Sequence, residues 1–150
     1  VRNAAHRPDV EALAPGVTAV DPEGFEAHGP FDVVLELVGA PNIPRNLAAL
    51  NPFGRIVVIG AGAGGDAQVN LHLLMQKRGR ILASTLRNRP LEQKADAARG
   101  IESQVLPQVA SGHIHVPIAA SFSLDDAPDA YARFAEGAKL GKVVIEMRAG

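Results

Sequence analysis

Six consecutive small residues, Gly60-Ala61-Gly62-Ala63-Gly64-Gly65, come closest to a binding motif in this chain. They match the pattern G-x-G-x-x-G, follow a run of apolar residues typical of a strand, and precede a helical pattern. Glycines at such a place let a pyrophosphate group approach the backbone at a helix N-terminus. However, Asp66 would repel phosphates, and no Asp or Glu ends the next strand about 20 residues further on. The motif therefore favours a glycine-rich loop that lines a cleft over a phosphate cradle, and a plain surface turn stays open as an alternative.

Histidines provide no metal site that the sequence can support. His113 and His115 stand at alternate positions of an extended segment, so both could point to the same side. A zinc ion needs three or four ligands, and no third ligand is near these two in sequence. The chain has no cysteine, which excludes a cysteine-ligated zinc lobe or a disulfide within it. Nothing resembles a nucleophile with its base, so we name no catalytic residue and predict no metal.

The composition is that of an ordinary globular protein and excludes several classes of partner. Of its 150 residues, 47% are hydrophobic and 21% are charged, and the formal net charge is −1. Such a balance gives no electrostatic reason to expect nucleic acid or an acidic membrane as a partner. The longest apolar runs are far shorter than the roughly 20 residues of a membrane helix, and no signal sequence opens the chain. We expect one core in a soluble, cytoplasmic protein and, because the chain begins at Val1, a fragment.

Three apolar runs, at residues 31–38, 55–60 and 80–86, predict buried strands that position the candidate residues. A helical pattern with Asn42 as a plausible N-cap separates the first two, and a shorter one around Leu71 and Met75 separates the second from the third. Strands that alternate with helices favour a parallel sheet covered on both faces. In such a sheet the turns that leave the strands gather at one rim, where ligands bind.

The remaining elements are predicted from local patterns. We expect a helix at 4–13, a strand at 17–20 that Pro22 ends, and a loop at 23–30. A long helix is expected from Leu91 to Ser111, with Gly112 as its stop. The last part is expected to be extended at 113–124, helical at 127–140 and a strand at 142–147.

Four blocks of the chain resemble the medium-chain dehydrogenase/reductase superfamily, in its zinc-independent, quinone oxidoreductase-like branch. They are FDVVLELVG at 31–39, LNPFGRIVVIG at 50–60, STLR at 84–87 and GKVV at 141–144, and they run over essentially the whole chain. The resemblance implies an α/β, Rossmann-like parallel sheet with helices on both faces, whose first strand and phosphate loop lie upstream of Val1. Residues 1–150 would then be part of a nicotinamide dinucleotide-binding domain, with 113–150 packing partly on an absent GroES-like catalytic domain.

The same resemblance implies roles for ten residues in cofactor binding. Arg2 and Asn3 would end the second strand of the family's sheet, where a basic residue suits a 2′-phosphate, so Arg2, helped by Arg7, suggests NADP (NADPH) over NADH. Further candidates lie where three strands end: Val38 and Gly39 beside the adenosine, Ile59, Gly60 and Ala61 beside the nicotinamide riboside, and Leu86 and Arg87 at the sixth strand. That last strand, residues 80–86, would pair with its twin in a homodimer. Two alternatives stay open: Arg2 is simply a solvated side chain, and the edge strand is covered in a protein that does not dimerise.

The function that the resemblance implies is NADPH-dependent reduction of a small-molecule substrate, a quinone, enone or related carbonyl compound, by hydride transfer. The chain alone would be inactive. One alternative is an S-adenosylmethionine-dependent methyltransferase, whose sheet typically finishes with an antiparallel hairpin. Another alternative is a non-catalytic nucleotide-sensing module, which the fold alone does not exclude.

Overall fold

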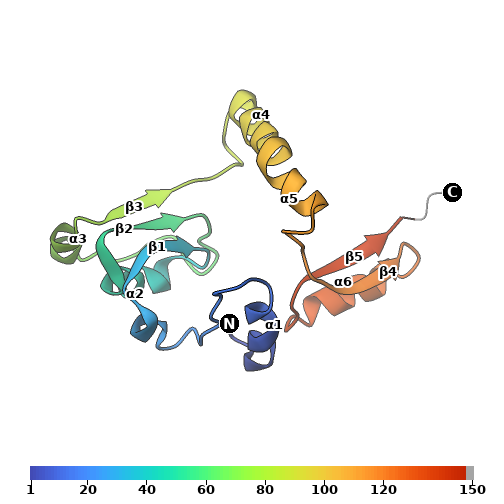
Figure 1. The fold of residues 1–150 in the computed structure, drawn as a ribbon, viewed down its shortest axis with the longest axis horizontal. Helices are drawn as coiled ribbons and strands as arrows, with labels where there is room; N and C mark the ends of the chain where they lie inside the picture. The colour runs from blue at the N-terminus through green and yellow to red at the C-terminus, as the bar shows by residue number, and fades with distance from the viewer. Residues whose placement is uncertain (148–150) are drawn as a thin grey trace. The chain divides into compact units, whose positions relative to one another are not determined.

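The computed structural model describes residues 1–147 and divides the chain between two units (Figure 1). Unit 1 consists of Val1–Arg2 and Ala19–Pro90, and unit 2 of Asn3–Thr18 and the residues from Leu91 onward. The cluster of buried apolar residues lies in unit 1, and each unit is described by itself. The strand and helix patterns along the chain do not reveal which segments share contacts, and unit 2 is assembled from two distant segments.

Unit 1 contains the three strands that the sequence predicts. In chain order its elements are the 3-10 turn η2 (Phe25–His28), β1 (Phe31–Glu36), the 3-10 turn η3 (Ala40–Asn42), α2 (Ile43–Ala48), β2 (Leu50–Val58), α3 (Leu71–Lys77) and β3 (Arg80–Ala83). The strands form one sheet in the order β1-β2-β3, and both pairs are parallel. The predicted βαβ arrangement is therefore confirmed, and the loops that leave the three strands lie at one end of the sheet.

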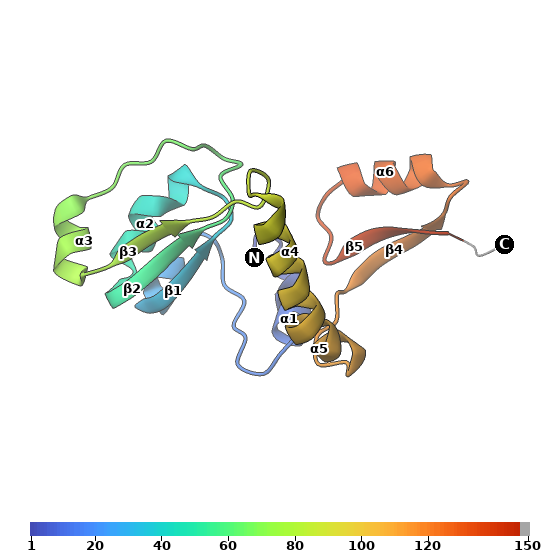
Figure 2. The ribbon, with the colours of Figure 1, turned by 90° about the horizontal axis from the view of Figure 1, so that it is seen from above.

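The core of unit 1 lies between the sheet and two helices on the same face (Figure 2). Ile43 and Leu47 of α2 pack with Leu50 and Ile56 of β2, and Leu73 and Leu74 of α3 contact this cluster. Leu47, Leu50 and Ile56 are fully buried. Burial of each such side chain stabilises the fold by roughly 1.5–3 kcal/mol, so this cluster anchors the sheet that carries the rim.

The other face of this sheet carries large apolar side chains that remain accessible. Leu35, Val57 and Leu82 are aligned across the three strands, and Val33 lies two residues before Leu35. The exposed fractions of Val33, Leu35 and Leu82 are 46%, 58% and 48%. The sequence predicts strands that are buried on both faces. Within unit 1, α2 and α3 cover one face of the sheet, and the other face is left accessible.

Strand β2 begins earlier than predicted because the expected turn is built into it. The pairing shifts from Phe31 opposite Leu50 to Val33 opposite Arg55, so β2 has extra residues that β1 does not match. Phe53 in this bulge has a φ of 65°, a backbone conformation that usually marks a turn. The turn signal at 51–54 is therefore correct, while the expected start of the strand at Arg55 is not.

Three other expectations for this part of the chain need correction. Residues 17–20 form no strand, and the run begins inside a turn in which the Val17 amide donates to the Ala14 carbonyl at 3.4 Å. The expected loop at 23–30 contains η2. Strand β3 ends at Ala83 instead of Leu86, because the chain turns after the Ser84 amide donates to the Val58 carbonyl at 3.1 Å.

Unit 2 has its own two-stranded sheet. Its elements are the 3-10 turn η1 (Ala4–His6), α1 (Arg7–Glu11), α4 (Leu91–Gly100), the π-helical turn η4 (Ile101–Val105), α5 (Leu106–Ala110), β4 (Ile118–Ser123), α6 (Ala127–Ala135) and β5 (Lys142–Glu146). Strands β4 and β5 are parallel, and α6 contacts both of them. The predicted final helix and strand are confirmed with shorter bounds, and the N-terminal segment joins this unit through His6, whose Nε2 lies 3.1 Å from the Ala138 carbonyl oxygen.

The long helix predicted at 91–111 is interrupted in its middle. Pro107 has no N–H to donate to Ser103, so the regular α-helical pattern cannot continue through it. At the residue directly before Pro107, the Leu106 amide donates to the carbonyl of Ile101, five residues back, which is the spacing of a π-helix. The helix therefore consists of α4, η4 and α5. Within residues 1–147, no helix combines the length and the apolar character that crossing a membrane requires.

Candidate site at the carboxyl ends of β1 and β2

The loops that leave β1 and β2 are hydrogen-bonded to each other. The Ile59 and Gly60 amides donate to the Glu36 carbonyl, at 3.0 and 3.3 Å. Further along, the Ala63 amide donates to the Val38 carbonyl at 2.9 Å, and the Ala40 amide donates to the Gly64 carbonyl at 3.0 Å. These hydrogen bonds join the two loops at the carboxyl ends of β1 and β2, where the parallel topology predicts that they meet. We call residues 37–42 and 59–65 the rim loops.

Two glycines allow the rim loops to come this close. A Cβ at Gly39, whose φ is +116°, would lie 2.6 Å from the Gly64 carbonyl oxygen and 2.7 Å from the Ala61 Cα. A Cβ at Gly60 would lie 2.4 Å from the Leu37 carbonyl oxygen. Because all three obstacles are backbone atoms, a side chain at either position would push the loops apart. Of the ten predicted residues, the rim brings together five: Val38, Gly39, Ile59, Gly60 and Ala61.

A buried carboxylate underlies the first rim loop, and sequence reasoning missed it. Glu36 is 3% exposed, and its Oε1 accepts from the amides of Val38 at 2.5 Å and Gly39 at 2.8 Å. Asn46 Nδ2 donates to Oε2 at 2.5 Å, and Asn42 Nδ2 donates to Oε1 at 3.4 Å. Burial alone would raise the pKa of Glu36, but hydrogen bonds from Gly39, Val38, Asn46 and Asn42 together hold the pKa below its usual value.

The signal for this residue was present in the sequence as an acidic interruption of an otherwise apolar strand. A charged residue in a buried strand needs partners, which in β1 applies to both Asp32 and Glu36. The structure decides between them, because Asp32 is exposed and Glu36 is buried. Asn42, expected to cap α2, makes no side-chain cap there and instead donates its side-chain amide to Glu36.

The glycine-rich loop does not have the arrangement of a phosphate cradle. The amides of Gly60, Ala63 and Gly64 already donate to protein carbonyls. The next helix, α3, begins only at Leu71, where Asn70 caps it by accepting from the Leu73 amide at 3.0 Å. A phosphate cradle needs the glycine-rich loop to lead directly into the helix N-terminus, but residues 66–70 lie between Gly65 and α3, which disfavours the literal phosphate-binding interpretation.

The same loop does line a hollow, which disfavours the interpretation as a plain surface turn. A cavity of about 180 Å³ lies beneath it and is lined by Gly39, Ala40, Ile43, Val58, Ala61, Gly64, Gly65, Ala67, Val69 and Ile81. The lining is almost wholly apolar and comes from both rim loops, α2 and the sheet. The expectation of a glycine-rich loop beside a cleft is confirmed.

The other five predicted residues are not gathered at this rim. Leu86 and Arg87 follow β3 in an exposed turn, which Arg89 fixes by donating to Ser84 Oγ at 2.7 Å and to the Thr85 carbonyl at 2.9 Å. Arg2 is exposed in unit 1, whereas Asn3 and Arg7 belong to unit 2. The Asn3 side chain accepts from the Ala5 amide at 3.1 Å and so begins η1. The predicted group at the cofactor's 2′-phosphate, which draws on both units, therefore stays a prediction.

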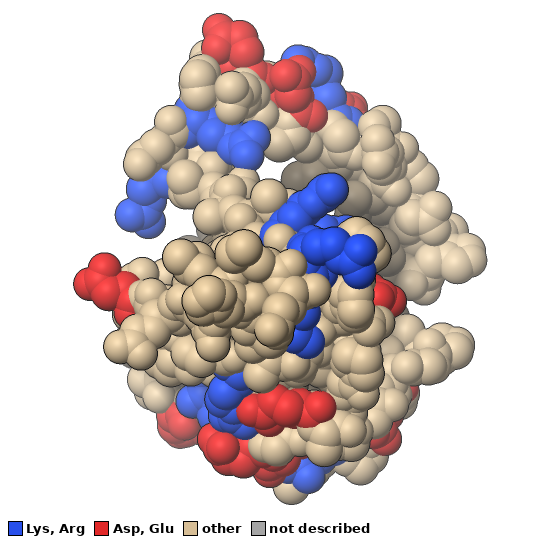
Figure 3. Space-filling view, turned by 90° about the vertical axis from the view of Figure 1, so that its left-hand side faces the viewer, with Lys and Arg blue, Asp and Glu red and all other residues tan. Residues whose placement is uncertain are grey.

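Metal ligands and surface charges are dispersed. His113 Nδ1 lies 2.6 Å from Ser111 Oγ, and among the residues that the structure describes no three His, Asp or Glu side chains gather as a metal site requires. On the face shown in Figure 3, basic and acidic side chains both occur, in places side by side, on a surface that is largely uncharged.

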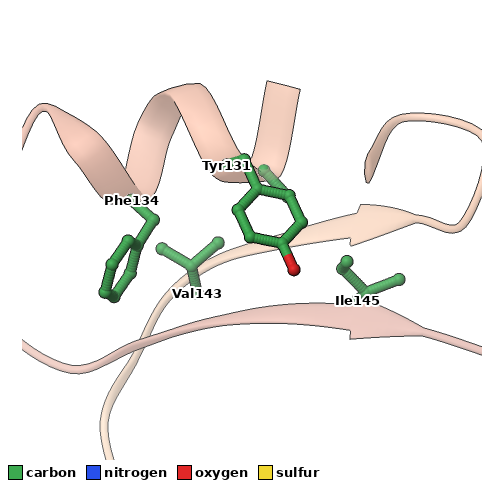
Figure 4. Close-up of a pocket in the computed structure, with 5 residues that line it drawn as sticks. Tyr131, Phe134, Val143 and Ile145 are labelled. Carbon is green, nitrogen blue, oxygen red and sulfur yellow. The ribbon is translucent and has the colours of Figure 1, made fainter. Parts of the chain in front are cut away.

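Unit 2 has a separate apolar hollow of about 240 Å³ between α6 and β5. Figure 4 shows Tyr131 and Phe134 from the helix and Val143 and Ile145 from the strand lying around it. Tyr131 and Phe134 are 72% and 63% exposed. Exposed aromatic side chains around an apolar hollow are typical of surfaces that contact another protein domain.

Comparisons with known proteins agree with the blocks noted in the sequence. A thermostable alcohol dehydrogenase from Pyrobaculum aerophilum matches 98% of this chain with a TM-score of 0.75 and 22% identity. A quinone oxidoreductase from Pseudomonas syringae matches 97% with a TM-score of 0.70 and 22% identity. The chain covers 41% and 47% of these two proteins. These likenesses confirm the Rossmann-like fold class.

Sequence comparison adds a relative and a family. A segment of a phenolphthiocerol/phthiocerol polyketide synthase from Mycobacterium tuberculosis is 31% identical over 117 residues, which are 77% of this chain and 5% of that protein. The profile of the zinc-binding dehydrogenases matches residues 16–145. That match spans most of the chain, and the chain therefore belongs to the zinc-binding dehydrogenase family, within the medium-chain dehydrogenase/reductase superfamily.

Proposed function

We propose that this chain is the cofactor-binding part of an NADPH-dependent oxidoreductase that transfers hydride to a quinone, enone or related carbonyl compound. The observation that carries the proposal is the rim at the ends of β1 and β2, where Gly39 and Gly60 bring two loops into backbone contact. Ligands of open parallel sheets bind outside the carboxyl ends of the strands, which is where these loops lie.

The work of this chain in such a reaction is binding and orientation. A bound nicotinamide cofactor would supply the hydride chemistry, while the protein holds the ring in place and excludes water. The backbone at Val38, Gly39, Ile59, Gly60 and Ala61 would hold the adenosine and nicotinamide portions. The exposed residues Arg2, Asn3, Arg7, Leu86 and Arg87 complete the proposed set. No acid, base or nucleophile of this chain is assigned to the reaction.

The proposal includes a companion domain, because this chain covers less than half of the alcohol dehydrogenase and of the quinone oxidoreductase that it resembles. Residues 113–147 would pack partly on that domain, and residues 148–150 lie outside the described part of the chain. The exposed apolar side chains of Val116, Ile118, Tyr131 and Phe134 support this role. The chain alone would then be inactive, and the whole enzyme would work in the cytoplasm.

The family description names zinc, but the described residues do not fit a zinc ion. A zinc site needs three or four His, Cys, Asp or Glu ligands. No three such side chains come together within residues 1–147. No step of the proposed reaction is therefore routed through a metal by this chain.

Of the two alternatives, the methyltransferase is contradicted by the family match. Its expected antiparallel hairpin is also missing from the final sheet of the described residues, since β4 and β5 run parallel. A non-catalytic nucleotide-sensing module would bind the same cofactor without turnover. We call this chain together with the proposed companion domain the longer protein. Measuring whether the longer protein oxidises NADPH with a quinone as acceptor distinguishes an enzyme from a nucleotide-sensing module.

Calorimetric titration of the longer protein with NADPH and with NADH tests the proposal. We expect tighter binding of NADPH, and we expect Arg2→Ala to weaken NADPH binding about tenfold, because a hydrogen bond to a charged group contributes roughly 1.5–3 kcal/mol. NADH binding should stay unchanged. Arg99→Ala is the matched control, since Arg99 is exposed and pairs with Asp96 on α4. Equal affinity for both nucleotides would remove the role assigned to Arg2, and binding of neither would contradict the proposed function.

A further inference from the structure

Glu36 is a buried carboxylate that all of the cofactor-binding assignments leave unused. Its four hydrogen-bond donors are the amides of Val38 and Gly39 and the side-chain amides of Asn42 and Asn46. All four donors are neutral. Asn46 is itself 3% exposed, so the pair that it forms with Glu36 is shielded from water.

A buried charge of this kind is costly unless its hydrogen bonds are satisfied, and well-packed apolar residues often stabilise a core equally well. Stability alone is therefore a weak reason for a glutamate at this position. The location of the hydrogen-bond donors gives a stronger reason for a glutamate at position 36. Two of them are consecutive backbone amides in the first rim loop, and one belongs to Gly39, whose backbone has a φ of +116°.

The same residue also holds the second rim loop. The Glu36 carbonyl accepts from the amides of Ile59 and Gly60, at the point where β2 ends. The carboxylate thus fixes one loop and the carbonyl fixes the other. Their relative position depends on where Glu36 itself is held, and Asn46 on the buried side of α2 holds it.

We propose that Glu36, held by Asn42 and Asn46, is a positioning residue that sets the geometry of both rim loops for the cofactor. It does not touch the cofactor and acts through the backbone of residues 38–39 and 59–60. This inference rests on the proposed function of the rim. Its immediate consequence, that the carboxylate orders the rim loops, concerns this chain alone.

The test replaces the carboxylate by an amide of the same shape. In Glu36→Gln, one end of the side chain can still accept from the backbone amides, but the other end becomes a donor that faces the Asn46 donor. The double variant Glu36→Gln/Asn46→Asp restores an acceptor at position 46 and moves the negative charge there. Ile56→Val is the matched control, because Ile56 is fully buried in the same unit and its change lowers thermal stability without touching the rim bonds.

In the longer protein we expect Glu36→Gln to weaken NADPH binding about tenfold, because the charged hydrogen bond between Asn46 and the Glu36 carboxylate is lost. The double variant should regain the NADPH affinity of the wild type. The control should bind within about twofold of the wild type at comparable loss of melting temperature. Backbone hydrogen exchange of this chain should be faster at Val38 and Gly39 in Glu36→Gln and unchanged there in the control. Unchanged binding and exchange in Glu36→Gln, or equal loss of binding in the control, would overturn the proposal.

The two proposals can fail separately. If the wild-type protein binds neither nucleotide, the proposed function is wrong, and the exchange rates at Val38 and Gly39 still decide whether Glu36 orders the rim. If the wild type binds NADPH but Glu36→Gln binds it equally well, only the positioning role is wrong.

Discussion

Arg45 on α2 shows how one side chain can hold several segments of unit 1. Its guanidinium forms an ion pair with Glu26, lies 3.3 Å from a Glu23 carboxylate oxygen, and donates to the Pro22 carbonyl at 3.0 Å. It also lies 5.1 Å from the centre of the Phe25 ring. The hydrogen bond from Arg45 is the main reason why the pKa of Glu26 is lowered to about 2. Residues 22–26 are thereby tied to the helix that also presents Asn46.

The lowered pKa of Glu26 predicts acid sensitivity of unit 1. In the unfolded chain this carboxyl titrates near its usual value of 4.5, and in the folded chain near 2. The ion pair therefore contributes its full stability above pH 4.5, and this contribution is lost as the pH falls toward 2. Glu26→Gln should flatten this part of the stability profile, measured by urea denaturation between those pH values. Asp66→Asn, a change at an exposed carboxylate of the same unit, should leave the slope as it is in the wild type.

The family resemblance and the position of glycines at strand ends together predicted part of the site. Gly39 and Gly60 could be singled out because glycine at a strand end often signals close backbone approach, and the structure confirms that approach. Glu36 could not be placed, because the distance from its carboxylate to Asn46 depends on how α2 packs on the sheet. The roles of Arg2 and Arg7 come from the family resemblance alone and stay a prediction, since the two residues belong to different units.

At the scale of elements, the close approach of the loops that leave β1 and β2 depends on glycines, which have no side chain. Gly60→Ala would place a methyl group 2.4 Å from the Leu37 carbonyl oxygen, so the two strand ends must separate. We expect a loss of roughly 1–3 kcal/mol in the free energy of unfolding, as for other overpacked sites, together with weaker NADPH binding.

The glycine-rich loop offers its own control for that variant. A Cβ at Gly62 would meet no atom within 4 Å. Gly62→Ala should therefore change the free energy of unfolding by no more than about 0.5 kcal/mol. Thermal denaturation and calorimetry on both variants check the pair, and equal effects at positions 60 and 62 would show that close backbone approach is not what Gly60 provides.

The elements that could be predicted are those with a strong local pattern. The apolar runs beginning at Phe31 and Arg80 became strands at those residues, because their side chains pack on α2 and α3. The run at 17–20 has similar composition but does not become a strand. The interruption of the long helix at Pro107 could have been predicted from the sequence, since a proline removes a hydrogen-bond donor from the helix interior.

At the scale of the whole molecule, β3 is an edge strand of the sheet in unit 1. An exposed edge can pair with a second copy of itself, and we expect a homodimer through residues 80–86. Leu82→Arg places a charge on this half-exposed strand and, across a two-fold axis, brings like charges together. Dimerisation measured by sedimentation equilibrium should weaken at least about tenfold.

Met75→Arg on α3 is the comparison for that experiment, because Met75 is 72% exposed and lies outside the edge strand. It should leave the dimer unchanged. A wild-type protein that sediments as a single chain at every concentration would show that this edge is covered in another way.

Unit 2 is built from residues 3–18 and from residues beyond Leu91, and this has a consequence for synthesis on the ribosome. The first of these segments leaves the ribosome before its partner around Ala138, which accepts the hydrogen bond from His6, because Ala138 follows His6 by 132 residues in the chain. Unit 1, which except for its first two residues is one continuous stretch, can complete its sheet in the meantime. Since domains generally fold as units during synthesis, unit 1 should complete its fold before unit 2 does.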